Sequence, residues 1–348
     1  MKKKKGNSLL LRVLGGLLGV VIVIGGSRFW FWLSDNKLPN VSLGKDLYVY
    51  PDTTPEEVLA SLDSCVRRPG SLKRAFAGHQ VAEYMKPGHY VVEAGQTSVY
   101  ITRMLNNCWQ TPVQLRIPSV RLKGSLARSI ASQMMVDSAT VADALENREL
   151  LERYGFKPAT AFSLFMPDTY EMYWTASIDD IFDRQKKAWD AFWTPDNMAK
   201  AKKQGLSRQQ VSVLASIVKG ESNVPSDYAR IAGVYLNRLH RGMKLQADPT
   251  VAFLLGYESS RILKKDLKID SPYNTYMYAG LPPGPINVPG KEYLNAVLNP
   301  DTASGYLFFC ADPSFNGTHR FARTYSEHLQ NARAFQKALD KRARQKEK

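Results

Sequence analysis

Residues Ser207–Glu221 read SRQQVSVLASIVKGE and predict a helix that ends on a glutamate. Ser207 is a good N-cap, and Gln210 is placed three residues later to complete a capping box. At about 100° per residue, Glu221 falls within about 60° of the apolar stripe of this helix. The stripe consists of Leu214, Ile217 and Val218. The pattern therefore predicts a carboxyl group that faces the interior of the protein.

A glutamate in this position is a candidate general acid. An apolar wall disfavours the charged form of a carboxyl group, so the pKa of Glu221 should rise. A carboxylic acid that stays protonated near neutral pH is what general-acid catalysis requires. The alternative is a buried glutamate that pairs with an arginine or caps a neighbouring element, because structural ion pairs also occupy such positions.

The chain on either side of this helix has the pattern of a mixed α+β protein. Expected strands lie at 41–50, 113–117 and 306–310, and expected helices at 56–62, 121–135, 137–154, 178–193, 226–241 and 326–344. The segment 162–173 is expected to be extended, and KAKK at 200–203 is expected to be a charged connection. The length suffices for two domains. We expect a small α+β module at 40–112 and a larger mixed α+β catalytic domain at 113–345.

The N-terminus predicts a single transmembrane helix at 9–33, preceded by a cytoplasmic tail at 1–8. No polar residue occurs from Val13 to Gly26, and a membrane helix needs about 20 largely apolar residues. Aromatic residues at 29–32 form a belt at one end, and lysines at 2–5 favour a cytoplasmic N-terminus. The chain after the anchor then lies outside the cytoplasmic membrane. A cleavable signal peptide, ending at the small residues Gly25-Gly26-Ser27, is the alternative.

The formal net charge of +15 comes in large part from the Lys-rich N-terminus and the tail at 337–348. Such a balance fits nucleic-acid binding in a cytoplasmic protein, but the expected anchor argues against that partner. Outside the membrane, a positive body suits anionic lipid heads or an anionic cell-wall polymer.

The cysteines and histidines give no metal site. An oxidising compartment permits one disulfide among Cys65, Cys108 and Cys310, and Cys65–Cys108 is the expected pairing of the three. The five histidines are scattered, and no Cys/His spacing suggests three or four convergent ligands. We therefore expect neither a metal nor another cofactor.

Five segments together resemble the endolytic murein transglycosylase family, membrane-anchored enzymes that cut peptidoglycan strands. The segments are FMPDTYEM at 165–172, LASIVKGES at 214–222, VYLNRLHRGMKLQADPTV at 234–251, SPYNTYMYAGLPPGPINVPG at 271–290 and YLFFCADPSFNGTHRFARTYSEH at 306–328. Their order and spacing make the resemblance specific, and it covers roughly residues 115–340. For residues 40–112 the resemblance implies a small LysM-like module.

The resemblance assigns the catalytic acid to Glu221. The family's motif has two acids, Glu-x-Glu, where this chain has Lys219-Gly220-Glu221. Lys219 therefore replaces the first acid. Helix geometry supports Glu221 independently, since position 219 points about 200° away from position 221. Gly220 is expected to loosen the end of the helix.

Seven further residues are candidates for binding the substrate. They are Gln246, Asp248, Tyr273, Asn274, Thr275, Tyr276 and His319. Amide, hydroxyl and aromatic groups on one loop suit sugars, which present rims of hydroxyls and apolar ring faces. Gln246 would bond sugar hydroxyls, and Asp248 would orient the substrate or Glu221.

These candidates also have structural interpretations. Asp248 could cap a helix whose first residue is the following proline, and Arg238 could be its ion-pair partner. The loop at 273–276 could be held by its tyrosines alone, with the Pro-rich run after it as rigid support. A lone histidine often only satisfies its neighbours, an interpretation that we favour for His328 and leave open for His319.

The resemblance implies a lyase. Glu221 would protonate the oxygen that leaves C1 of N-acetylmuramic acid, and the 6-hydroxyl of the same sugar would close on C1 to leave a 1,6-anhydro end. Cuts within glycan strands would terminate or trim nascent strands at the cytoplasmic membrane, with peptidoglycan and cell-wall synthesis proteins as partners. The alternatives are a hydrolytic muramidase and a non-catalytic, membrane-anchored scaffold that binds the cell wall.

Overall fold

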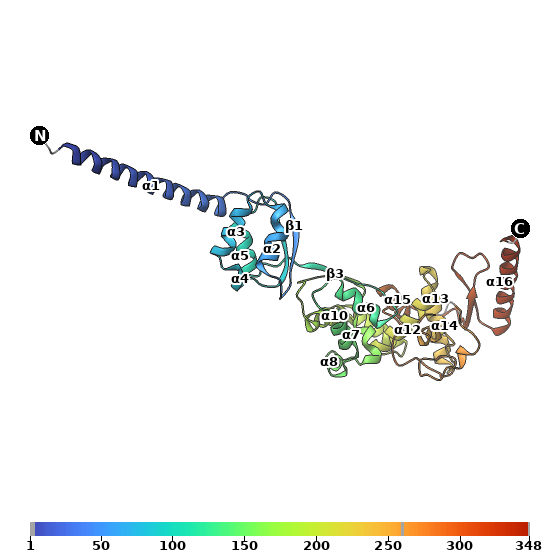
Figure 1. The fold of residues 1–348 in the computed structure, drawn as a ribbon. Helices are drawn as coiled ribbons and strands as arrows, with labels where there is room; N and C mark the ends of the chain where they lie inside the picture. The colour runs from blue at the N-terminus through green and yellow to red at the C-terminus, as the bar shows by residue number, and fades with distance from the viewer. Residues whose placement is uncertain (1–3, 259–260, 347–348) are drawn as a thin grey trace. The chain divides into compact units, whose positions relative to one another are not determined.

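The computed structural model of the chain describes residues 4–258 and 261–346 (Figure 1). Residues 1–3 of the expected cytoplasmic tail lie outside the described residues. The chain divides into two units. The first contains the residues up to Val113 together with Glu171–Thr175, and the second contains Gln114–Tyr170 and the chain from Ala176 onward.

The first unit begins with a long apolar helix, α1 (Lys4–Asn36). Its segment Leu10–Asn36 is long and apolar enough to cross a membrane, and it is the one such helix in the described part of the chain. The apolar side chains of this segment, including Phe29–Trp32, are exposed. Length and composition therefore agree with the expected anchor, although a signal sequence meets the same criteria.

The rest of the first unit is a two-stranded sheet covered by short helices. Strand β1 (Lys45–Val49) pairs antiparallel with β2 (Gly88–Val92), from Lys45↔Val92 to Val49↔Gly88. The helical elements are α2 (Pro55–Leu62), η1 (Asp63–Cys65), α3 (Pro69–Gly78), α4 (Val81–Tyr84) and α5 (Ser98–Asn106). Alternate residues of β1 face inward, so Leu47 and Val49 join a core with residues of α2, α3 and α5.

Polar contacts fix the end of α1 to the first unit. The guanidinium of Arg74 makes two hydrogen bonds to the carboxylate of Asp35, at 2.6 and 3.1 Å, and lies over the ring of Phe31. Arg68 donates to the backbone carbonyls of Ser34, Leu38 and Pro39. The C-terminal end of α1 is therefore held directly against the rest of the first unit.

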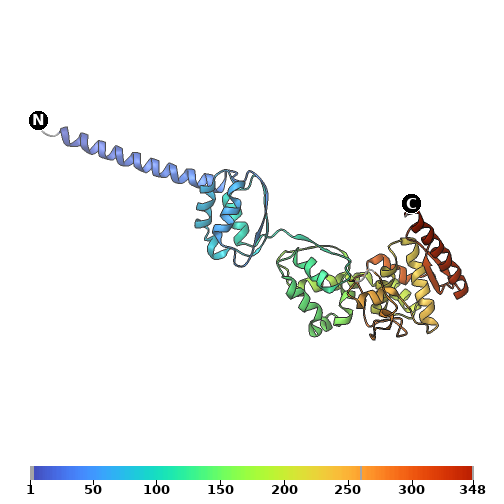
Figure 2. The ribbon, with the colours of Figure 1, turned by 45° about the vertical axis from the view of Figure 1, so that its right-hand side comes forward.

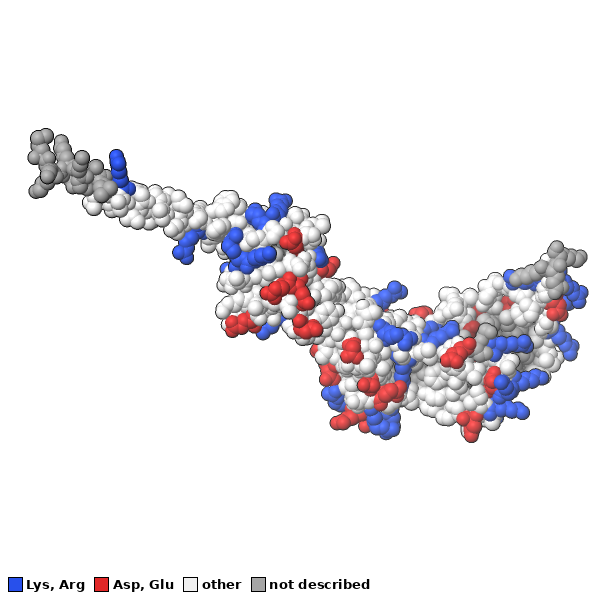
Figure 3. Space-filling view, viewed as in Figure 1, with Lys and Arg blue, Asp and Glu red and all other residues white. Residues whose placement is uncertain are grey.

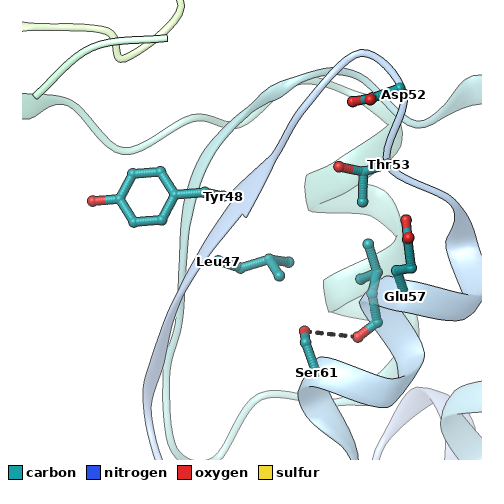
Figure 4. A pocket seen from close by; sticks show the side chains of 7 residues that line it. Leu47, Tyr48, Asp52, Thr53, Glu57 and Ser61 are labelled. Atoms are coloured by element: carbon teal, nitrogen blue, oxygen red, sulfur yellow. Dashed lines mark hydrogen bonds between the residues drawn. The ribbon is translucent and has the colours of Figure 1, made fainter. Parts of the chain in front are cut away.

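A shallow cavity of about 350 Å³ opens in the first unit between β1 and α2 (Figure 4). Its lining residues are Leu47, Tyr48, Asp52, Thr53, Glu57, Val58 and Ser61. The carboxylate of Glu57 is committed to the N-terminus of α2, because it accepts the backbone N–H of Thr54 at 2.7 Å. This cavity consequently offers no free carboxyl from α2 for acid–base chemistry.

The second unit is mainly helical, with small sheets. The strands β3 (Val113–Ile117) and β4 (Asp168–Met172) belong to it except for Val113, Glu171 and Met172, which are counted with the first unit. Its other elements are α6 (Lys123–Ala131), α7 (Ser138–Glu146), α8 (Arg148–Arg153), η2 (Pro158–Thr160), α9 (Ala161–Leu164), α10 (Ile178–Phe192), α11 (Pro195–Lys203), α12 (Arg208–Glu221), α13 (Pro225–His240), α14 (Asp248–Leu254), η3 (Asp266–Lys268), α15 (Lys291–Leu298), β5 (Phe308–Ala311), β6 (His319–Ala322) and α16 (Tyr325–Lys346). Strand β3 pairs with β4, and β5 pairs antiparallel with β6. The mixed α+β fold is thus confirmed.

Helix α12 forms the centre of the second unit. Every residue from Val211 to Val218 is buried, and the helix contacts α9, α11, α13, α14 and α15. At the C-terminal end of the chain, α16 packs on β5 and β6 (Figure 2). A polar carboxyl at the end of α12 is therefore surrounded by several elements of the unit.

Three expectations for local structure are wrong. The helix expected at 137–154 is two helices, because Asn147 leaves the helical conformation and its side chain caps α8 by accepting the N–H of Leu150. The connection expected at 200–203 is the last turn of α11, which Thr194 caps. The segment 162–173 is extended only in β4, since its first residues belong to α9.

The expected Cys65–Cys108 disulfide is also absent. Cys65, Cys108 and Cys310 are all free thiols. Cys65 is buried in the first unit, whereas Cys108 is exposed after the end of α5. The two side chains of the expected pair therefore occupy different environments.

Candidate active site

Glu221 is the last residue of α12, and the first turn of this helix is fixed by its own side chains. The hydroxyl of Ser207 accepts the N–H of Gln210 at 3.2 Å, and the side chain of Gln210 accepts the N–H of Ser207 at 2.8 Å. The predicted capping box is confirmed. The members of the apolar stripe, Leu214, Ile217 and Val218, are fully buried.

The surroundings of Glu221 raise its pKa. Burial, as the largest effect, raises the pKa from 4.5 to about 7, and the charge of Asp248 contributes in the same direction. Two groups act against this change. The hydroxyl of Tyr235 on α13 donates to Oε1 of Glu221, and the positive charge of Arg238 also favours the carboxylate. The result is a carboxyl group that can both give and take a proton near neutral pH, as predicted from the helix face.

A second carboxyl group, that of Asp248, begins α14 beside the end of α12. The close approach of the two helices depends on Gly220, where an added Cβ would lie 2.4 Å from Cβ of Pro249. Asp248 makes no side-chain cap to α14. Its Oδ1 instead accepts the hydroxyl of Tyr276 at 2.6 Å. Gly220 therefore brings two carboxyl groups to one place, instead of loosening the helix as expected.

These groups share a cavity of about 300 Å³ in the second unit. The lining residues are Glu221, Tyr235, Arg238, Leu245, Gln246, Asp248, Tyr276, Phe308, Phe309, Tyr325 and His328. Acidic and hydroxyl groups come from α12, α13, α14 and the loop before α15. Aromatic rings come from β5 and the start of α16. Paired carboxyls next to rings suit a polar ligand with apolar ring faces, which is the chemistry of a sugar.

The loop at 271–290 is pinned to α12. The hydroxyl of Ser216 accepts the N–H of Ile286 at 3.0 Å, and the side-chain amide of Asn287 donates to the carbonyl of Ser216 at 2.7 Å. Lys219 adds a further contact, because its ammonium donates to the carbonyl of Val288 at 3.1 Å and to the hydroxyl of Ser119. Burial lowers the pKa of Lys219 to about 8. Lys219 thus joins the end of α12 to the segments that contain Ser119 and Val288, and it does not line the cavity.

The structure brings three of the seven candidate binding residues to the cavity. Gln246, Asp248 and Tyr276 all line it beside Glu221. The backbone of Gln246 has a φ of 52°, in the left-handed region, and its N–H bonds the carbonyl of Thr275 at 3.1 Å. A positive φ is strained for a residue other than glycine, and the backbone bond to Thr275 holds this turn against the loop at 271–290.

The other four candidates lie outside the cavity lining. Asn274 is buried and donates to the carbonyls of Leu267 and Ile269. Thr275 is buried and bonds the N–H of Ala247 at 2.9 Å. Both residues therefore shape the loop and offer no free group to a sugar. Tyr273 packs against Phe253, with ring centroids 4.9 Å apart.

His319 is occupied by a structural partner. Its Nδ1 and its backbone N–H both lie 2.9 Å from Oδ2 of Asp227, a fully buried residue near the start of α13. The pair ties the start of β6 to α13. The interpretation of Arg238 as an ion-pair partner of Asp248 is also wrong, because its guanidinium donates to the carbonyls of Leu307 and Leu245 at 2.7 Å each.

Sequence reasoning missed several residues of the cavity. Tyr235 is not among the residues to which the sequence assigns a role, although Arg238 lies three residues later on the same helix face. His328, expected to be structural, lines the cavity, and its Nδ1 is buried without a partner among the described residues. The remaining missed residues are Leu245, Phe308, Phe309 and Tyr325. Only the pairing of β5 with β6 and the docking of α16 bring these rings to Glu221.

Among the residues that the structure describes, no group of three or more His, Cys, Asp or Glu side chains could hold a metal ion.

Comparison with known proteins identifies the family. The sequence profile of the YceG-like family matches residues 47–334. The chain belongs to this family. The matched region contains Glu221 and every residue that lines the cavity. The resemblance to endolytic murein transglycosylases is also confirmed, as the relatives of this YceG-like chain carry that name.

An endolytic murein transglycosylase of Bacillus subtilis is 38% identical over 192 residues, which are 54% of this chain and 50% of the relative. One of Streptococcus pneumoniae is 29% identical over 205 residues, which are 58% of this chain and 36% of the relative. The YceG-like chain thus spans half or less of the length of these relatives. A crystal structure of a YceG-like protein from Listeria monocytogenes has a TM-score of 0.55 and 26% identity, and the match covers 82% of this chain and 98% of that chain.

Proposed function

We propose that this chain is a lytic transglycosylase that cleaves the bond between N-acetylmuramic acid and N-acetylglucosamine inside peptidoglycan strands. The observation that carries the proposal is the carboxyl of Glu221, with a pKa of about 7, in a cavity that also holds a second carboxyl and aromatic rings. Relatives named endolytic murein transglycosylase support this substrate.

In the first step, protonated Glu221 gives its proton to the glycosidic oxygen. The bond from this oxygen to C1 of the muramic acid breaks, and the oxygen leaves as a hydroxyl of the next sugar. Positive charge then develops at C1 and on the ring oxygen. Asp248 is the second carboxyl of the cavity, and Tyr276 holds it by a hydrogen bond. A carboxylate in this position stabilises the developing charge.

In the second step, the 6-hydroxyl of the same muramic acid attacks C1. A C1–O6 bond forms, and the hydroxyl proton returns to Glu221, so the acid is regenerated without consumption of water. The hydrogen bond from Tyr235 stabilises the carboxylate that exists between the two steps. One carboxyl can serve in both steps because its pKa lies close to neutral pH.

The proposal includes a location and partners. Helix α1 would anchor the chain in the cytoplasmic membrane as a single span, with residues 1–8 in the cytoplasm and both units outside. Residues 40–112 would form a LysM-like module, and residues 113–345 the catalytic domain. The enzyme would then trim or terminate nascent strands close to the membrane, next to cell-wall synthesis proteins.

The test is a digest of purified peptidoglycan by the full chain in detergent. We expect products with 1,6-anhydro ends, one water lighter than reducing ends, and long fragments early in the reaction because the cuts are internal. Glu221→Gln should lower the rate by at least about 10²-fold, the usual contribution of a general acid. The matched control is Glu152→Gln, at an exposed position on α8.

Three other results of this digest would each lead to a different conclusion about the function. Reducing ends in place of anhydro ends would mean that water attacks C1 and that the enzyme is a muramidase. Binding of strands without any cleavage by wild type would favour a scaffold. Cleavage by Glu221→Gln at the wild-type rate would remove Glu221 from the mechanism.

A further inference from the structure

The cavity contains an aromatic wall to which the proposed chemistry assigns no role. Its three rings are those of Phe308 on β5 and of Tyr325 and His328 on the first turn of α16. None of them bonds Glu221 or Asp248. They belong to the C-terminal hairpin and helix, which pack on each other (Figure 2).

The rings of the aromatic wall touch one another. Phe308 stacks on His328 with centroids 5.4 Å apart and an interplanar angle of 26°. Tyr325 lies 5.8 Å from Phe308 and 6.1 Å from His328. The guanidinium of Arg238 lies 5.2 Å from the centroid of Phe308. Phe308 therefore contacts three neighbours, and the wall is a packed cluster.

Tyr325 is the member of the wall that is open to a ligand. Its side chain is 61% exposed although it lines the cavity, whereas Phe308 and His328 are half-buried. Its hydroxyl makes no hydrogen bond within residues 4–258 and 261–346. A buried structural tyrosine usually bonds its hydroxyl to another protein group, so an exposed ring without such a bond is available to a ligand.

The start of α16 is held in place before any ligand arrives. The hydroxyl of Thr324 accepts the N–H of Glu327 at 3.2 Å, and the carboxylate of Glu327 accepts the N–H of Arg323 at 2.9 Å. These capping bonds fix the backbone on both sides of Tyr325. A ring on a backbone that is already fixed loses less conformational entropy on binding, so more of its contact energy contributes to affinity.

We propose that Tyr325, supported by Phe308 and His328, is a platform that binds the apolar face of one N-acetylhexosamine ring of the glycan strand, next to the bond that Glu221 cleaves. The inference rests on the proposed function and adds a binding subsite to it. A β-linked pyranose directs its hydroxyls to the rim and its C–H groups to the two faces, so a flat ring at the end of a polar cavity complements it.

Binding in a cleavage-deficient background tests the platform apart from the chemistry. Full-length Glu221→Gln protein is titrated with N-acetylglucosamine oligomers and with isolated glycan strands in a calorimeter. We expect Tyr325→Ala to raise the Kd for both about tenfold, and Tyr325→Phe to stay within about twofold, because the ring carries the contact. The matched control is Tyr173→Ala in the first unit, a tyrosine that is 55% exposed and lies outside the cavity.

Kinetics of the otherwise wild-type enzyme give a second measurement. Tyr325→Ala should raise KM about tenfold with little change in kcat, which is the pattern of binding lost equally in ground and transition states. A Tyr325→Ala variant with unchanged KM and Kd would overturn the platform. Equal losses for Tyr325→Phe and Tyr325→Ala would also overturn it, because the hydroxyl and not the ring would then matter.

Two controls distinguish the platform from the proposed function and from a site for the peptide stem. If Glu221→Gln is inactive while Tyr325→Ala is normal, only the platform fails; if wild type itself leaves the strands uncut, the proposed function fails. Strands stripped of their peptide stems by an amidase decide what the rings hold. A tenfold loss that persists on stripped strands supports a sugar, and a loss that disappears means that the rings hold the peptide.

Discussion

Glu221 owes its acid–base character to opposing effects on a single carboxyl. Burial is the largest effect and favours the neutral form, while the hydrogen bond from Tyr235 favours the charged form. Because burial outweighs the hydrogen bond, the pKa settles at about 7. A stronger bond from Tyr235 would leave Glu221 too weakly protonated to act as an acid, and a weaker one would leave the carboxylate without support.

The balance between burial and the hydrogen bond from Tyr235 predicts that Tyr235→Phe shifts the dependence of kcat/KM on pH. Loss of the donor removes support for the carboxylate, so the pKa of Glu221 rises. The alkaline limb of kcat/KM, which reports loss of the protonated acid, should move upward by about half a pH unit to one unit. The control is Tyr228→Phe, also on α13, whose hydroxyl lies 3.1 Å from that of Tyr293 instead. An alkaline limb that stays in place would contradict the role of Tyr235.

The raised pKa of Glu221 also makes stability depend on pH. Between the ordinary value of 4.5 and about 7 the folded state binds the proton more tightly than the unfolded state. The stabilisation is therefore complete below about 4.5 and is lost as the pH rises to about 7. Its size is on the order of 3 kcal/mol.

Glu221→Gln should show this dependence directly. The amide carries no charge to bury, so we expect the variant to unfold at a higher temperature than wild type at pH 8, by a few degrees. The difference should shrink toward pH 4, where the wild-type carboxyl is neutral as well. Thermal unfolding followed by circular dichroism across this range is the measurement. A difference in Tm that does not vary with pH would argue against a buried acid.

At the scale of elements, the site depends on how closely α14 approaches α12. A Cβ at position 220 would lie 2.4 and 2.7 Å from two side-chain carbons of Pro249, whose ring is the neighbour of Asp248. The contact leaves no room for a methyl group, so any larger residue must push the two helices apart. Such a movement would separate the two carboxyl groups of the cavity.

Gly220→Ala should therefore reduce both activity and stability. We expect kcat/KM to fall more than tenfold and the free energy of unfolding to drop by about 1–3 kcal/mol, the usual cost of overpacking. Gly124→Ala is the matched control in α6, where the added Cβ meets only the flexible end of Arg128 at 3.6 Å. The control should be as stable as wild type or slightly more so. If both variants behave alike, the close approach does not position Asp248.

The sequence predicts those parts of this arrangement that depend on local patterns. Helix α12, its capping box and the inward face of Glu221 follow from residues at most 14 positions apart. Strand β3 has the predicted bounds for the same reason. Breaks in a helix, such as the one at Asn147, are harder to predict from the sequence, because a capping asparagine competes with continuation of the helix.

Other parts of the site could not be predicted because they depend on tertiary contacts. The aromatic wall combines residues from β5 and from α16, and no periodicity within one segment signals that they meet. His319 and His328 show the difficulty best. Each is a lone histidine in a matching segment, yet one bonds a buried aspartate and the other lines the cavity.

At the scale of the whole chain, positive charge is unevenly distributed. Lys and Arg side chains gather along α16 and around the C-terminal end of α1 (Figure 3). On α16 the basic residues Arg333, Lys337, Lys341 and Arg344 recur every three or four positions and so share one face of the helix, with Asp340 as the acidic residue among them. The first residue of the same helix is Tyr325. A positive field on the helix that carries the proposed sugar platform would attract an anionic wall polymer and raise its association rate.

The contacts at the end of α1 bear on where the first unit would lie relative to a membrane. Because Asp35 and Arg74 bind each other at the end of α1, the unit would begin directly at the surface of the bilayer. Chemical labelling of Cys108 can show on which side of the membrane the first unit lies. Cys108 is exposed, whereas Cys65 is buried, so in a Cys310→Ser background it is the thiol that a membrane-impermeant maleimide can reach.

We expect this reagent to label the full chain in right-side-out membrane vesicles, and the label to disappear in Cys108→Ser. The labelled chain should also resist extraction at alkaline pH, because α1 remains in the bilayer. A labelled chain that has lost its first residues and is released by alkali would mean that α1 is a signal peptide. Labelling only in inverted vesicles would place both units in the cytoplasm, where no peptidoglycan strand reaches Glu221, and the proposed function would fail on topology alone.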